Sequence, residues 1–192
     1  MISHLRPALV MLALFTLLTG LIYPLAITGL AQVLLPFGAN GSVVKRANQV
    51  VGSELIGQTF SLDRYFRPRP SAAGEKGYDA AGSSGSNLGP LSKKVIDRVE
   101  GDVAALRKAG AQTIPADAVT ASASGLDPHI SPAYAALQIA RVAAARGMTE
   151  ARVRALVEAT VERPALGLFG ESRINVLRLN LALDAAPPGG AG

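Results

Sequence analysis

A chain of 192 residues is long enough for one domain with a sizeable core, but too short for two full domains together with a membrane segment. Only 17% of the residues are charged, below the roughly 25% of soluble domains, which indicates that part of the chain is not in water. The net charge of +5 comes from Lys and Arg dispersed among Asp and Glu, so no nucleic acid is expected as a partner, and the absence of Cys excludes disulfides and thiolate sites.

The amino-terminal part of the sequence contains a long apolar interval. No charged residue occurs between Arg6 and Lys45. At about 1.5 Å of rise per residue, a helix over 8–35 exceeds the roughly 30 Å thickness of a bilayer's hydrocarbon core. We therefore predict a short leader over 1–7 and a transmembrane helix over 8–35, with a possible kink at Pro24.

A cleaved signal peptide is the alternative interpretation of this segment. Gly29 and Ala31 are small enough for a cleavage site. The apolar run is longer than the usual 7 to 15 residues of a signal peptide, however, and its basic leader is thin. Charges at the two ends are too similar to set the orientation of a membrane helix.

The next part of the chain reads as short strands followed by an irregular segment. Ser42 to Val44 and Leu55 to Phe60 are β-compatible and separated by Gly and Asn. Residues 61–90 are rich in Pro and Gly, which predicts an irregular but packed connection. Pro90 then opens a helix with valines at helical spacing, and Gly110 stands at its carboxyl-terminal cap.

Two further helices are predicted in the second half of the chain. Ser131 directly before Pro132 is a strong helix start, and Gly147 ends that helix. Thr149 caps a second helix that follows almost at once, so the two form an αα-hairpin.

The carboxyl-terminal element is ambiguous from sequence. Polarity alternates from Leu177 to Asp184 as in a strand, whereas the Leu and Ala content favours a helix, so 174–184 is left open. The tail over 185–192 is expected to be disordered. The fold class is therefore α+β, with one amino-terminal transmembrane helix followed by a single mixed helix and strand soluble domain over 36–184.

The stretch from Val119 to Gln138 holds Ser, Asp and His close together. A hydrolase interpretation takes Ser122, Ser124 or Ser131 as nucleophile, with His129 as base and Asp127 orienting it. Triad side chains converge from distant parts of a fold, whereas these residues lie in one tight turn, and the sequence contains no Gly-x-Ser-x-Gly elbow. We therefore expect no catalytic residue here.

Metal and anion sites are weakly supported. Asp127 and His129 are too few to hold a metal without Asp117, Asp79 or a partner chain, so no metal is expected. The loop from Gly82 to Pro90 leads into a helix, as anion sites do, but lacks the P-loop motif. A rigid packed loop is the expectation for that segment.

Several motifs in order along nearly the whole chain resemble the KdpC family, the small C subunit of the bacterial Kdp potassium-transporting ATPase. The motifs are GSELIGQTF (Gly52 to Phe60), YFRPRPSA (Tyr65 to Ala72), GYDAAGSSGSNLGP (Gly77 to Pro90), PADAVTASASGLDPHISPAYAALQIARVAAARG (Pro115 to Gly147) and ALGLFGESRINVLRLNLALD (Ala165 to Asp184).

The resemblance implies an accessory subunit and not an enzyme. Its partners would be a potassium-channel-like subunit, a P-type ATPase subunit and a small membrane peptide, besides the lipid bilayer. Such subunits are described as catalytic chaperones that raise the ATP affinity of the ATPase subunit. Carried over to this chain, the proposed nucleotide contacts are Ser122, Ser124, Gly125 and Gln138, with ATP bound through a shared site and no cofactor bound tightly. Ala123 stands where the family pattern has Gly.

The resemblance also implies a place in the cell: the bacterial inner membrane, crossed once, with the soluble domain on the periplasmic side. ATP is on the opposite side, so direct contact conflicts with this topology, although coupling free energy can cross through packed helices. A neighbouring subunit is then the favoured partner of the 119–138 stretch. The interface candidates are Tyr65, Arg69, Asn87, Asp127 and His129.

Three hypotheses about function therefore stand side by side. The first is a pump subunit. The second is a membrane-anchored hydrolase that uses Ser131 and His129, and the third is a free periplasmic binding module released by signal cleavage.

Overall fold

The structure is a computed structural model that describes residues 4–187. Residues 1–3 of the predicted leader and 188–192 of the predicted tail lie outside the described residues. The chain forms two compact units that divide between Val51 and Gly52.

The first unit consists mainly of one apolar helix. It comprises α1 (Leu5–Leu17), the π-helical turn η2 (Leu18–Ile22) and α2 (Tyr23–Leu34), and is followed by the short α3 (Pro36–Ala39). Together Leu5–Leu34 are long and apolar enough to cross a membrane, and their side chains are unburied in the chain itself. The helix predicted over 8–35 therefore begins three residues earlier. The π-helical turn precedes Pro24, which lacks the amide that would bond one turn back.

A β-hairpin follows, formed by β1 (Val43–Arg46) and β2 (Gln49–Ser53). Ala47 and Asn48 link the strands with φ of +46° and +65°, which is the backbone that a two-residue hairpin turn requires. The predicted piece Ser42 to Val44 overlaps β1. The strand predicted from Leu55 to Phe60 is wrong, because Ile56 forms only one isolated bridge, with Ser53, and no strand lies beside the rest.

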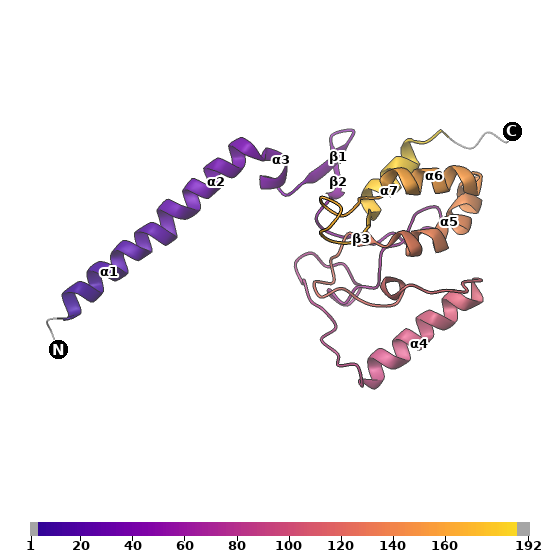
Figure 1. Cartoon of the computed structure of the whole chain (residues 1–192), viewed down its shortest axis with the longest axis horizontal. Helices are drawn as coiled ribbons and strands as arrows, with labels where there is room; N and C mark the ends of the chain where they lie inside the picture. The colour runs from indigo at the N-terminus through magenta and orange to yellow at the C-terminus, as the bar shows by residue number, and fades with distance from the viewer. Residues whose placement is uncertain (1–3, 188–192) are drawn as a thin grey trace. The chain divides into compact units, whose positions relative to one another are not determined.

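The second unit is built from helices and one very short sheet (Figure 1). Its elements are α4 (Lys93–Lys108), the 3-10 turn η3 (Ala116–Ala118), β3 (His129–Ile130), α5 (Pro132–Arg146), α6 (Glu150–Thr160), β4 (Ile174–Asn175) and α7 (Val176–Ala185). Strands β3 and β4 pair antiparallel, so segments about 45 residues apart meet at the point where α5 and α7 begin. With the apolar helix before it, this unit confirms the α+β class.

The helix ends follow the sequence signals closely. The Ser131 hydroxyl accepts from the Tyr134 amide at 3.0 Å, and Gly147 ends α5 in the left-handed region. The Thr149 hydroxyl caps α6, so the predicted αα-hairpin of α5 and α6 is confirmed. The helix predicted from Pro90 begins at Lys93, while Gly110, at φ +95°, ends it as expected.

The ambiguous carboxyl-terminal element is a short strand followed directly by a helix. Ile174 and Asn175 form β4, and α7 starts at once. The Asn175 side chain makes this switch possible because its Oδ1 accepts from the Arg178 amide at 3.1 Å, as a helix cap.

The core lies between α5, α6 and α7, and the irregular segment supplies part of it. Phe66 is fully buried although it belongs to no helix or strand. The other members are Ala118, Val119, Ile130, Tyr134, Ala135, Ile139, Val142, Ala143, Val153, Val157, Ile174, Val176, Leu179 and Leu183.

Candidate functional site

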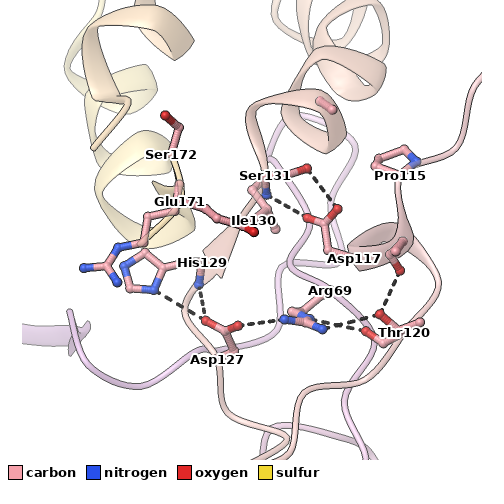
Figure 2. A pocket seen from close by; sticks show the side chains of 13 residues that line it. Arg69, Pro115, Asp117, Thr120, Asp127, His129, Ile130, Ser131, Glu171 and Ser172 are labelled. Carbon is pink, nitrogen blue, oxygen red and sulfur yellow. Dashed lines mark hydrogen bonds and ion pairs between the residues drawn. The ribbon is translucent and has the colours of Figure 1, made fainter. Parts of the chain in front are cut away.

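A surface pocket of about 590 Å³ opens where β3 leads into α5 (Figure 2). Its lining combines acidic, basic and hydroxyl side chains from segments far apart in the sequence. The lining residues are Arg69, Pro115, Ala116, Asp117, Thr120, Asp127, His129, Ile130, Ser131, Ala133, Glu171, Ser172 and Arg173. Three of the five predicted interface residues are among them.

Arg69 and Asp127 form the central ion pair of this pocket. The Arg69 Nη1 donates to Asp127 Oδ2 at 2.9 Å, and both side chains are largely covered. The same guanidinium donates to the backbone oxygen of Thr120 at 3.3 Å. Arg69 therefore joins the irregular segment to two points of the 115–131 stretch.

His129 lies between two carboxylates. Its Nδ1 is 3.4 Å from Asp127 Oδ1, and its Nε2 is 3.8 Å from Glu162 Oε2. Glu162 also pairs with Arg173 at 3.0 Å and Arg178 at 3.3 Å. The imidazole is thus part of a charged network beside the pocket.

Electrostatics favour the ionised form of Asp127. Burial acts to raise its pKa, but hydrogen bonds from the His129 side chain and backbone, together with Arg69, outweigh burial and lower the pKa to about 2. Behind the pair, burial first and Asp127 second raise the pKa of Tyr78, whose hydroxyl donates to the Arg69 carbonyl at 2.6 Å. Asp127 is therefore a carboxylate and not a proton-donating acid at neutral pH.

Ser131 is engaged by a different acid. Its hydroxyl donates to Asp117 Oδ1 at 2.9 Å, and its amide donates to Asp117 Oδ2 at 2.7 Å. Among residues 4–187, no hydrogen bond joins His129 to Ser131, Ser122 or Ser124. Asp127, His129 and Ser131 of the hydrolase hypothesis therefore line one pocket, without a hydrogen bond between the proposed base and nucleophile, and Ser122 and Ser124 do not line it.

The Ser122 to Gly125 loop packs against the other Ser and Gly segment of the chain. The carbonyl of Ser124 accepts from the Ser84 amide and from the Ser83 hydroxyl, both at 3.0 Å. A Cβ on Gly125 would meet the Ser84 oxygen at 2.5 Å. The small residues of both segments are thus explained by close backbone contact, and the packed loop predicted over 82–90 is seen at residues 83–85.

Gln138 is buried, at 6% exposure, and both the oxygen and the nitrogen of its side-chain amide are hydrogen bonded. Its Oε1 accepts from the Arg67 amide at 2.8 Å and from the Arg141 guanidinium at 2.6 Å, and its Nε2 donates to the Arg67 carbonyl at 3.0 Å. None of the four proposed nucleotide residues, Ser122, Ser124, Gly125 and Gln138, lines the pocket.

Two of the interface candidates lie outside the pocket. The Tyr65 hydroxyl donates to Asp184 at 3.1 Å, and the Arg146 guanidinium lies 5.0 Å from the centre of its ring. Asn87 is exposed at φ +50°.

Sequence reasoning missed part of this site. Thr120, Glu171 and Arg173 line the pocket, and Glu162 supports it. The first three lie inside the family motifs, but no chemical pattern in the sequence singles out any of the four as site residues. The usable signal was indirect: pairing of β3 with a strand after residue 173 would bring the 171–173 segment to His129.

Comparison with known proteins decides the family. A model of the KdpC family, described as "K+-transporting ATPase, c chain", matches residues 5–185. The chain belongs to the KdpC family. The resemblance drawn from the five motifs is confirmed, and the match includes the apolar helix of the chain as well as its second unit.

Curated KdpC relatives agree along the full length. A protein of Caulobacter vibrioides named "Potassium-transporting ATPase KdpC subunit" is 58% identical over 190 residues, which cover 98% of this chain and 96% of the relative. Proteins of the same name from Rhodopseudomonas palustris and Allorhizobium ampelinum are 54% and 57% identical, and cover 98% and 97% of this chain and 100% and 98% of their own lengths.

Proposed function

We propose that this chain is the accessory C subunit of a potassium-transporting ATPase in the bacterial inner membrane. The observation that carries the proposal is the family match over residues 5–185, which spans the apolar helix and the domain together. The helix crosses the bilayer once and packs on partner helices. Its partners are a channel-like subunit, an ATP-hydrolysing subunit and a small membrane peptide.

The proposed role is non-catalytic. The Ser131 hydroxyl is committed to Asp117 and to its own helix, and His129 is held by carboxylates. A pocket lined by both signs of charge can recognise a complementary polar surface on a partner. Arg69, Asp127 and His129 are the residues of the proposed contact.

The soluble domain is proposed to lie on the periplasmic side, and to raise the ATP affinity of the ATPase subunit by coupling through the complex. Support comes from Gln138, which is buried and whose side-chain oxygen already accepts from Arg67 and Arg141, so a nucleotide could reach that oxygen only by displacing these bonds. Coupling through packed helices requires no such rearrangement.

Thiol labelling in intact spheroplasts tests this topology. The chain has no Cys, so single cysteines at Ser86 and Ser124, both exposed, report the domain, and His4→Cys reports the opposite end of the helix. An impermeant reagent should label the first two from outside and His4→Cys only after lysis. The reverse pattern would place the domain with cytoplasmic ATP and overturn the periplasmic assignment.

Co-purification tests the assembly itself. A tagged chain should bring the other subunits with it in mild detergent. Recovery of the chain alone, from membranes in which the other subunits are present, would overturn the proposed function.

A further inference from the structure

Three large apolar side chains stand exposed on one loop of the second unit. Leu166, Leu168 and Phe169 are 89%, 81% and 67% exposed, and no charged residue occurs from Pro164 to Gly170. We call these three residues the apolar tip. Scattered exposed leucines are ordinary, but three in four consecutive residues form a patch that the core does not use.

The loop that carries the apolar tip is ordered by backbone hydrogen bonds. The amides of Ala165 and Phe169 donate to each other's carbonyls, at 2.9 and 3.0 Å. At its base the amides of Glu162 and Arg173 do the same, at 2.8 and 3.0 Å, and their side chains pair as well. The tip is therefore held on two bonded arms, one that follows α6 and one that leads into β4.

The backbone at the tip also adopts a conformation that is unfavourable in free energy. Leu166 has φ of +54°, a conformation that costs an L-residue on the order of 1 kcal/mol, and its side chain gains no burial in return. Strain of this kind, kept without any gain for the chain's own core, is typical of a binding site.

We propose that the apolar tip inserts into an apolar pocket on another subunit of the ATPase, an inference that rests on the proposed function above. Three such side chains bury on the order of 400 Å², whereas a standard interface needs about 800 Å² from each partner. A second copy held by the tip alone would therefore bind too weakly. The tip fits an anchor inside an assembly that the membrane helix already helps to hold.

Charge decides between a protein pocket and a lipid surface. The arms carry Glu162 and Glu171 against Arg163 and Arg173, so they have no basic excess to hold anionic headgroups. The Glu171 to Arg173 arm also lines the charged pocket. An apolar centre beside a polar rim is the usual anatomy of a protein interface.

Site-specific photo-crosslinking tests the occupant. A photoreactive amino acid replaces Leu168 in the full chain, within membranes that hold the whole complex, and Leu91, which is 92% exposed, is the matched control. We expect position 168, and not 91, to crosslink to another subunit. Adducts with lipid or with a second copy, or equal products from both positions, would overturn the proposal.

A charge substitution measures the contribution of the tip. Leu168→Asp should lower the recovered complex about tenfold or more, as loss of an interface anchor does, whereas Leu91→Asp should leave it unchanged. Unfolding of the isolated full chain should be the same for both variants. Equal recovery of the complex with both variants would overturn the proposal that the apolar tip anchors the chain. Failure of the wild-type chain to assemble would instead overturn the proposed function.

Discussion

The side chain of Gln138 binds both backbone groups of Arg67: its oxygen accepts from the Arg67 amide at 2.8 Å, and its nitrogen donates to the Arg67 carbonyl at 3.0 Å. Asn180 does the same for the preceding residue, Phe66, at 2.8 and 3.0 Å. Two side-chain amides, one from α5 and one from α7, thus replace the strand that would normally pair with an extended segment. This explains how an irregular segment reaches the core without unpaired backbone groups.

Replacing either amide should destabilise the second unit. Gln138→Ala and Asn180→Ala each leave two covered backbone groups without partners, at a cost of about 2 to 3 kcal/mol in the free energy of unfolding. Chemical unfolding of the full chain in mild detergent, followed by circular dichroism, measures the loss. Gln112→Ala, at an exposed position, is the control and should change little.

The same variants separate a structural role of Gln138 from nucleotide contact. If the amide acts only as a clamp, ATP affinity of the assembled complex should be altered no more by Gln138→Ala than by Asn180→Ala. A specific loss of ATP affinity for Gln138→Ala, with stability unchanged, would instead support direct contact.

Gly125→Ala should destabilise the loop that carries the proposed nucleotide motif. Gly125 has φ of +68°, and a Cβ there would lie 2.5 Å from the Ser84 oxygen, so strain and overlap together should cost about 2 to 4 kcal/mol. Gly89→Ala is the matched control, because it has open space and no positive φ. Equal midpoints in a thermal unfolding scan would show that the two Ser and Gly segments are not packed as described.

Features set by neighbouring residues could be predicted from the sequence. The Ser131 cap, the Gly147 end and the Thr149 cap each depend on a few consecutive residues, and the structure has all three. The hydrogen bonds of Gln138 depend on Arg67, which lies 71 residues away, and no pattern of neighbouring residues predicts them. The candidate site shows the same division. Asp127 and His129 are close neighbours in the sequence, whereas Arg69, the partner of Asp127, is distant in the sequence.

The 174–184 element shows why periodicity alone failed there. On α7 the buried positions Val176, Leu177, Leu179, Asn180 and Leu183 follow helical spacing, but one of them is polar. Because Asn180 serves the Phe66 backbone from inside the core, the sequence loses the apolar residue that would have revealed the helix and alternates like a strand.

Ser131→Ala should affect stability and not chemistry. The hydroxyl caps α5 and binds Asp117, so its removal should cost about 1 to 2 kcal/mol. Thr149→Ala, which removes the cap of α6, should give a comparable loss. Potassium-dependent ATPase activity per assembled complex should be retained by Ser131→Ala and by His129→Ala, and its abolition in both would contradict a purely structural role of these side chains.

Asp127 should make the second unit sensitive to acid over a defined range. Its pKa falls from 3.8 to about 2 on folding, so the ionised carboxylate contributes stability above the unfolded value and loses it as the pH falls through the folded one. A shift of this size corresponds to about 2 kcal/mol. The difference in unfolding free energy between the wild type and Asp127→Asn should therefore be near its full value above pH 5 and nearly vanish by pH 2.

Chemical unfolding at a series of pH values measures this difference, with Asp63→Asn as the control. Asp63 pairs with Arg67 at 2.7 Å, but both side chains are well exposed, so the corresponding difference should stay small at every pH. A wild-type advantage over Asp127→Asn that persists unchanged at pH 2 would mean that the carboxylate's charge is not what Arg69 and His129 stabilise. The ion pair at the centre of the pocket would then contribute through shape alone.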